Sequence, residues 1–131
     1  MKLLLLRLCL VTFSILLVDF VWLYVLLGQR YTRMFEAIQK ARPRYGRKWA
    51  GLSAQALVAV GLTLLCLKED EWSAEMQANC FLYGLCAFGI YNGTNLFAFD
   101  DYAPSMAAVD TLYGTLTCGA VGFGVAKVLT S

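Results

Sequence analysis

The sequence predicts an all-α fold, a bundle of four transmembrane helices joined by short loops. Sixty per cent of the 131 residues are hydrophobic, only 15% are charged, and the mean hydropathy is +0.62. Soluble domains are about 45–50% apolar and about 25% charged. The apolar residues also form four long stretches, each near the ~20 residues that a helix needs to cross the bilayer. A soluble all-helical protein is the alternative, but the first stretch is too continuous for a one-sided apolar face.

The expected spans cover about residues 8–27, 49–67, 76–99 and 104–128, and they make one membrane domain over residues 1–131. The first span has features of a secretory signal peptide, because Lys2 and Arg7 precede an apolar run. That run is too long for this role, contains Asp19, and lacks a small-x-small cleavage site before Gln29. We therefore expect a retained membrane helix.

The third and fourth spans contain polar residues but are long enough to cross with some tilt. Both also carry small residues at helical spacing, which let membrane helices approach closely. In the third span these are Gly89 and Gly93; in the fourth they are Gly114, Cys118 and Gly122, flanked by Gly119 and Gly124. We expect them to pack helices of one chain together, with a homo-oligomer interface as the alternative.

The connectors between the spans differ in charge. The acidic connector 68–75 and the base-free connector 100–104 contrast with the first connector, which has one acid, Glu36. Seven of the eleven basic residues lie in that first connector: Arg30, Arg33, Lys40, Arg42, Arg44, Arg47 and Lys48. Because Lys and Arg are enriched in cytoplasmic loops, we expect this connector in the cytoplasm and both termini on the other side.

Three interpretations of the basic connector are open. It serves as a topology determinant alone, or it binds anionic lipid headgroups through an interfacial helix with Tyr31, Phe35 and Ile38 as its apolar stripe. Nucleic-acid binding is the least favoured, because no aromatic platform or known binding module accompanies the basic residues. The bilayer is thus the expected partner, with anionic headgroups as a candidate ligand and no nucleic acid. A second copy of the chain, or a larger membrane assembly of which it is a subunit, is the alternative partner.

Polar residues inside the spans are the candidate functional site. A charged side chain near the bilayer centre costs at least ~2.5–3.5 kcal/mol, so such residues are rare and usually face a partner. At a rise of ~1.5 Å per residue, Asp19 and Asn92 lie ~13 and ~12 Å from the cytoplasmic ends of their spans, and Asp110 lies ~9 Å from its own. We expect a shared polar cluster in the cytoplasmic half of the membrane, composed of Asp19, Asn92, Thr94, Asn95 and Asp110.

Four further side chains are expected to support this cluster: Trp22, Tyr91, Tyr113 and Gln55. Trp22 follows Asp19 by three residues and Tyr113 follows Asp110 by three, so each pair shares a helix face. The indole N–H and the phenol can each donate to a carboxylate. No basic residue lies at that depth, so the acids are protonated, solvated, bound to a cation, or reached by Arg30 or Arg33.

Other chemistries are not expected. The five cysteines lack Cys-x-x-Cys spacing and the chain has no histidine, which disfavours zinc sites and Cys–His catalysis. No phosphate-binding loop, serine-nucleophile elbow or metalloprotease motif occurs. We therefore expect no metal, no cofactor and no catalytic residues, and a non-enzymatic protein is favoured over an enzyme.

Residues 81–96, FLYGLCAFGIYNGTNL, resemble the signature of a family of small predicted membrane proteins, a domain of unknown function, family twenty-one seventy-seven. The resemblance extends to residues 19–23 and 109–114 and to Tyr31, and it implies four helices with no assigned activity. Similar proteins usually carry Asp at the position of Asn92 and Trp at that of Tyr113. An amide at position 92 retains hydrogen bonding but does not titrate, which weakens a proton-relay hypothesis.

Three functions remain as hypotheses. The first is a structural or accessory membrane component, in which the polar cluster fixes helix packing or binds a headgroup. The second is a small transporter or channel, oligomeric in form, in which Asp19 and Asp110 bind a proton or cation. The third is a membrane enzyme acting on lipid.

Overall fold

A computed structural model describes residues 1–43, 46–68 and 72–130, apart from the side chain of Thr130. Over these residues the chain is helical and contains no strand, which confirms the all-α class. Two helices end in a wider π-helical turn, labelled η. The elements are α1 (Lys2–Phe20), η1 (Val21–Leu26), α2 (Gly28–Gln39), α3 (Lys48–Gly61), η2 (Leu62–Cys66), α4 (Ala74–Ala98) and α5 (Pro104–Thr130).

Three helical segments of the described chain are long and apolar enough to cross a membrane. They are Lys2–Leu26, Lys48–Cys66 and Pro104–Leu129. The fourth expected span corresponds to α4, which has 25 residues but carries polar side chains such as Gln77, Asn79 and Asn92 along its length. The count of four spans therefore stays a prediction.

Local sequence explains where α4 and α5 begin. The Ser73 hydroxyl accepts a hydrogen bond from the Met76 backbone N–H at 3.1 Å and caps the first turn of α4. Proline occupies the first position of α5, where its missing N–H leaves no intrahelical bond unmade. Residues 99–103 connect the two helices: Phe99 ends α4 in an extended conformation, and the Tyr102 backbone N–H donates to the Phe99 carbonyl oxygen at 3.1 Å.

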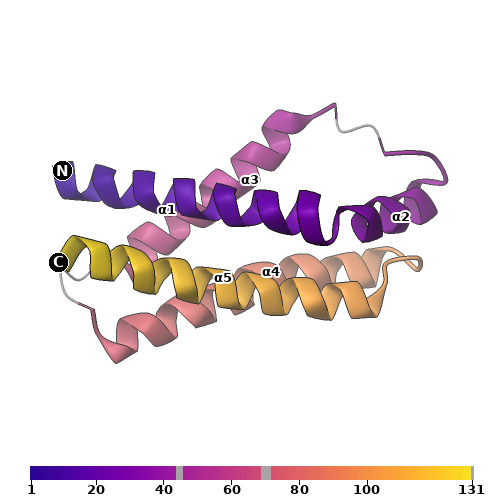
Figure 1. Ribbon diagram of the computed structural model, residues 1–131. Coiled ribbons are helices and arrows are strands. Elements are labelled where there is room, and N and C mark those ends of the chain that lie inside the picture. Colours follow the sequence, from indigo (N-terminus) through magenta and orange to yellow (C-terminus); the bar gives the residue numbers. More distant parts are fainter. Residues whose placement is uncertain (44–45, 69–71, 131) are drawn as a thin grey trace.

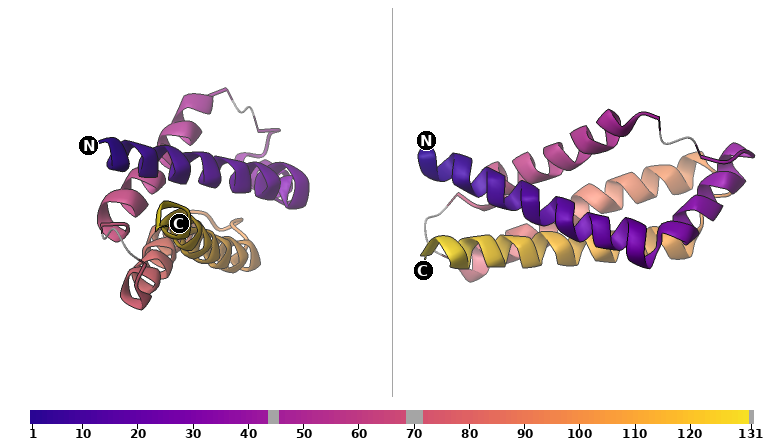
Figure 2. Two further views of the ribbon diagram at one scale, coloured as in Figure 1. Left: turned by 60° about the vertical axis from the view of Figure 1, so that its left-hand side comes forward. Right: turned by 45° about the horizontal axis from the view of Figure 1, so that its top comes forward.

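The helices form a bundle in which α4 and α5 lie antiparallel along most of their length (Figure 1). Helix α1 packs along α5, and α3 crosses α1 at a steep angle. Figure 2 gives two further views of this crossing. Both termini lie at one end of the bundle, whereas α2 and the 99–103 connection lie at the other. The main core fills the crossing region with buried residues such as Val11, Ile15, Ala59, Leu62 and Cys118.

The contact between α4 and α5 depends on four glycines, which we call the glycine seam: Gly84, Gly114, Gly119 and Gly122. A Cβ atom on Gly84 would lie 2.5 Å from the Gly114 carbonyl oxygen and 2.9 Å from the Thr115 Cα atom. A Cβ on Gly114, Gly119 or Gly122 would collide with an α4 side chain, that of Phe88, Phe81 or Cys80, which confirms the expected close packing at these three glycines.

The other three glycines pack less closely. Among the described residues, a Cβ on Gly93 or Gly124 would meet nothing within 4 Å, so the expected close packing fails there. A Cβ on Gly89 would make an ordinary van der Waals contact with the Thr111 methyl group on α5 at 3.8 Å. The Gly-x-x-x-Gly step of α4 thus lies only loosely against α5, and the tight contact runs through Gly84 instead.

Helix α2 is a short amphipathic helix folded back on the bundle. It follows a break at Leu27, and a Cβ on Gly28 would lie 2.4 Å from the Leu23 carbonyl oxygen, so the bend needs glycine there. Its buried residues Tyr31 and Met34 form a second core with Tyr102, Met106 and Ala107. A helix is present where the interfacial helix is expected, but its apolar stripe of Tyr31, Phe35 and Ile38 packs against the bundle, and a place at the membrane surface stays a prediction.

Candidate functional site

The carboxylate of Asp110 on α5 is the centre of the candidate site. Its side chain is 7% exposed. One oxygen, Oδ1, accepts a hydrogen bond from the Tyr31 hydroxyl group on α2. The other, Oδ2, accepts from the Asn92 amide nitrogen on α4 at 2.8 Å. Both oxygens of this acid therefore have partners from other helices.

Asn92 is the most buried polar residue of the site, with 2% of its surface exposed. Besides Asp110, its amide nitrogen donates to the Phe88 carbonyl oxygen at 2.9 Å and to the Thr111 hydroxyl group at 3.2 Å. Its amide oxygen accepts from the Tyr102 hydroxyl group at 2.7 Å. The amide thus joins α4, α5 and the connection between them.

The carboxylate of Asp19 on α1 is held on one side only. Its Oδ1 atom accepts from the Tyr113 hydroxyl group on α5 at 2.5 Å. The Oδ2 atom is buried and has no hydrogen-bond partner among the residues that the structure describes. The two acids therefore differ, because Asp110 is fully satisfied by protein groups and Asp19 is not.

Two aromatic rings join the surroundings of these acids. The Trp22 indole stacks on the Tyr113 ring, with ring centroids 4.1 Å apart and planes 6° from parallel. Its N–H group donates to the Tyr31 hydroxyl oxygen at 3.3 Å. A chain of contacts thus runs from one acid to the other. We call the whole set the tyrosine–carboxylate network: Asp19, Trp22, Tyr31, Asn92, Tyr102, Asp110, Thr111 and Tyr113.

The acids and aromatic donors pair between helices. The sequence spacing predicts Trp22 with Asp19 and Tyr113 with Asp110, and both pairings are wrong. Tyr113 donates to Asp19, and Trp22 donates to Tyr31. The aspartate side chain is short, so its carboxylate stays near its own backbone. The tyrosine and tryptophan side chains are long and place their hydroxyl or indole N–H group against a neighbouring helix. The acid and the donor on one helix face therefore do not meet.

The other predicted residues lie at the edge of the network or outside it. Asn95 interacts with the hydroxyl groups of Tyr91 and Tyr102, and Tyr91 itself is 49% exposed. Thr94 is exposed, and its hydroxyl group bonds the Ile90 and Tyr91 carbonyl oxygens of its own helix, so the structure does not bring it to the acids. Gln55 on α3 has a buried amide oxygen without a partner in the described part of the chain.

Sequence reasoning missed the roles of Tyr31, Tyr102 and Thr111. A signal existed for Tyr31, because a tyrosine on an apolar helix stripe has a hydroxyl group that needs a partner when buried. Tyr102 follows two acids in a connector and has no comparable sequence signal. Burial raises the pKa of Tyr31 and raises that of Tyr102 to about 12, so both remain hydrogen-bond donors at neutral pH.

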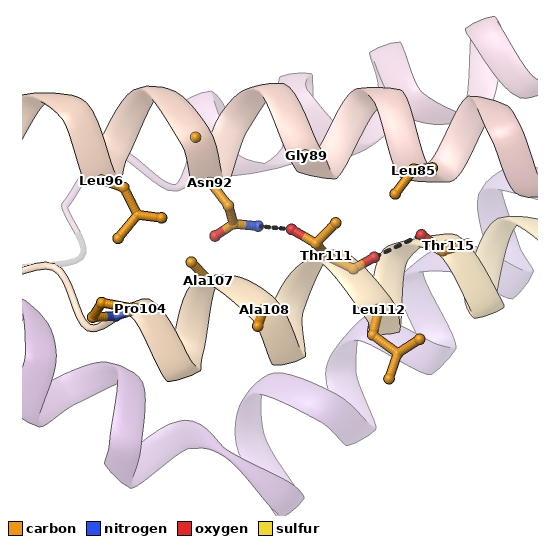
Figure 3. Close-up of a pocket in the computed structure, with 11 residues that line it drawn as sticks. Leu85, Gly89, Asn92, Leu96, Pro104, Ala107, Ala108, Thr111, Leu112 and Thr115 are labelled. Carbon is orange, nitrogen blue, oxygen red and sulfur yellow. Dashed lines mark hydrogen bonds between the residues drawn. The ribbon is translucent and has the colours of Figure 1, made fainter.

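A shallow groove of about 490 Å³ runs along the outer side of this site between α4 and α5. Figure 3 shows Asn92 pointing across it toward Thr111, with Leu96 and Leu112 on its walls. The open glycines Gly89 and Gly93 also line it. Asn92 and Thr111 thus place the edge of the network at the surface of the bundle.

The basic residues that we expect to bind headgroups lie on α2, in the residues that follow it and at the start of α3. Arg44 is outside the described residues. The remaining six are exposed and form no ion pair within residues 1–43, 46–68 and 72–130: Arg30, Arg33, Lys40, Arg42, Arg47 and Lys48. No group of three or more Cys, Asp or Glu side chains in those ranges is arranged to hold a metal ion. These bases add exposed positive charge to the hydrogen bonds inside the bundle.

Comparison with known proteins gives one match. Residues 4–126 match the family described as Predicted membrane protein (DUF2177). No curated protein and no solved structure matches the chain. Since the match covers nearly the whole sequence, the chain belongs to the DUF2177 family of predicted membrane proteins.

Proposed function

We propose that this protein is a non-enzymatic structural or accessory membrane component, in which the tyrosine–carboxylate network fixes the arrangement of the helices. The observation that carries this proposal is that the hydrogen-bonding atoms at the centre of the network all have partners within the chain. Both oxygens of Asp110 and both polar atoms of Asn92 bond to groups of the same chain. A site that takes up a ligand keeps donors or acceptors free for it, whereas a packing device uses them internally.

The orientation in the membrane is part of this proposal. The end that carries α2 faces the cytoplasm, both termini face the other side, and α4 is the fourth span. The basic connector and the positive-inside rule support this orientation. The antiparallel pairing of α4 with the apolar helix α5 supports α4 as a span, because its 25 residues match the length of that neighbour.

The network is expected to act through several modest contributions. Hydrogen bonds between membrane helices average ~0.6 kcal/mol and reach ~1.7 kcal/mol. Four bonds join different elements here: Tyr31–Asp110, Asn92–Asp110, Tyr102–Asn92 and Tyr113–Asp19. Together they supply about 2–3 kcal/mol at the average value, enough to select one arrangement of the helices.

Thermal unfolding of the purified protein in detergent tests the proposal. Asp110→Ala and Asp19→Ala remove the acceptors, and Asp110→Ala is expected to lower the free energy of unfolding by about 1–3 kcal/mol. Thr94→Val is the matched control, because it removes a hydroxyl group that bonds only its own helix. The proposal fails if neither Asp variant is less stable than the Thr94 variant.

A second function rests on the Oδ2 atom of Asp19, which has no hydrogen-bond partner among the described residues. A buried carboxylate oxygen of this kind is a candidate site for a proton or cation, as a small transporter or channel requires. In proteoliposomes, Asp19→Asn would then abolish a proton or cation flux while leaving the fold intact, because the new amide still accepts from Tyr113. Absence of flux from the unaltered protein would exclude this function.

A further inference from the structure

Six exposed bases lie in the connector between the first two candidate spans and at the start of the second, and we call this set the basic platform: Arg30, Arg33, Lys40, Arg42, Arg47 and Lys48. Three acids lie at the same end of the bundle, namely Glu36 on α2 and Asp100 and Asp101 in the connection between α4 and α5. The bases therefore outnumber the acids two to one. None of the six forms an ion pair in the described part of the chain, so their charge is available to an external anion.

The part of the platform that lies on α2, namely Arg30 and Arg33, is held in a fixed orientation by the buried side of this helix. Tyr31 is 8% exposed and Met34 is 6% exposed, and both pack against Tyr102 and Met106. The Tyr31 hydroxyl group donates to Asp110 inside the bundle. With this side of α2 fixed, Arg30 and Arg33 remain on its exposed surface.

We propose that the basic platform binds the headgroups of anionic lipids, and that the Tyr31–Asp110 hydrogen bond positions it from within the bundle. This inference rests on the proposed function, because it gives the network a partner at the membrane surface. Binding is electrostatic and uses the guanidinium and ammonium groups of the platform, while Tyr31 acts as a positioning residue that does not touch the lipid.

Two features of the chain favour lipid over another anionic partner. The platform lies at the end of candidate membrane spans, where headgroups are already concentrated. Trp49 follows Arg47 and Lys48 directly and is 68% exposed, as is typical of tryptophans at the membrane–water interface. Basic residues next to membrane helices attract anionic lipid. This attraction weakens with distance from the membrane surface and is largely lost beyond one Debye length.

The first test measures lipid preference in proteoliposomes with spin-labelled phosphatidylglycerol and phosphatidylcholine. The full chain is expected to associate more strongly with the anionic lipid, and the double variant Arg30→Gln/Arg33→Gln is expected to lose this preference by about fivefold for each base removed. The matched control, Lys2→Gln/Lys68→Gln, removes two exposed charges outside the platform. An equal loss in the control, or no loss in the platform variant, overturns the proposal.

The second test concerns Tyr31. Tyr31→Phe removes no charge, yet it is expected to reduce the phosphatidylglycerol preference and to raise hydrogen exchange within residues 28–39 alone. Tyr24→Phe is the control, because Tyr24 is 75% exposed and precedes the bend. Unchanged preference in Tyr31→Phe with raised exchange in α2 would contradict the positioning role.

The outcomes separate this inference from the proposed function. If Asp110→Ala destabilises the protein but Arg30→Gln/Arg33→Gln keeps its lipid preference, the network stands and the platform fails. Binding of an acidic peptide by the detergent-purified protein, with no preference between the two lipids, would assign the platform to a protein partner instead.

Discussion

The glycine seam and the tyrosine–carboxylate network hold the same helices in different ways. At the seam, α4 and α5 approach so closely that a single Cβ atom on Gly84 would lie 2.5 Å from a carbonyl oxygen. In the network, side chains reach across wider gaps to bond one another, as Tyr113 does to Asp19. The seam joins α4 and α5 through backbone contact at Gly84 and through α4 side chains packed on Gly114, Gly119 and Gly122. The network joins α1, α2, α4 and α5 through hydrogen-bonding side chains.

This difference follows from what drives association inside a bilayer. Lipid tails are as apolar as leucine, so helices associate through close packing and interhelical hydrogen bonds. Close packing leaves no room for an added atom, least of all at Gly84, where the neighbouring atoms include backbone of α5. Hydrogen bonds are weaker, but each requires a specific partner. The seam therefore supplies strength, and the network determines which helices meet and where.

The largest expected effect comes from an added atom in the seam. Gly84→Ala is expected to lower the free energy of unfolding by about 3 kcal/mol, since its methyl group meets the backbone of Gly114 and Thr115. Circular dichroism during thermal unfolding in detergent measures this.

Gly93→Ala is the matched control for that variant. It adds the same methyl group to the same helix, and nothing lies within 4 Å of the added atom. We expect it to be neutral or to stabilise by about 0.5–1 kcal/mol. Equal destabilisation by both variants would show that the seam has no special role.

Most of the fold is predictable from the sequence, because length and hydropathy alone determine where membrane helices form. The candidate spans are Lys2–Leu26, Lys48–Cys66 and Pro104–Leu129. They match the expected spans closely at every end except the first, where the helix begins at Lys2 and the expected span at about residue 8. The seam was harder to predict. Gly89 and Gly93 have the same spacing as glycines that do pack, and only the rotation of α4 decides which of its faces meets α5.

The sequence predicts that Asp19, Asn92 and Asp110 lie near one another, and the hydrogen bonds of Asn92 to Asp110 and of Tyr113 to Asp19 bring their helices together. Their depth in the membrane stays a prediction, and the pairings of the side chains differ from the predicted ones. The sequence did not indicate that α2 folds back to bring Tyr31 to Asp110. That contact depends on a bend at Leu27 and Gly28, which the spacing of hydrophobic residues along the sequence does not reveal.

A smaller effect concerns Tyr102 and pH. Tyr102→Phe leaves the buried Asn92 oxygen without its donor and is expected to cost about 1 kcal/mol at pH 8. Because burial raises the folded-state pKa of Tyr102 from 10 to about 12, its contribution is present below pH 10 and is lost as the pH rises toward 12. Melting temperatures between pH 8 and 11 measure this.

The Tyr102 variant should differ from the unaltered protein less at pH 11 than at pH 8. A difference that stays constant across this range would mean that Tyr102 titrates alike in the folded and unfolded chains, contrary to its burial in the network.

The most direct test is a double-mutant cycle between Tyr31 and Asp110, which lie 79 residues apart in the chain and meet only through the network. Free energies of unfolding are measured for Tyr31→Phe, Asp110→Ala and both together, with Thr94→Val and Asp110→Ala as the control cycle. A coupling energy of about 0.6–1.7 kcal/mol is expected for the first pair and about zero for the control. Zero coupling between Tyr31 and Asp110 would contradict the claim that this network holds the helices together.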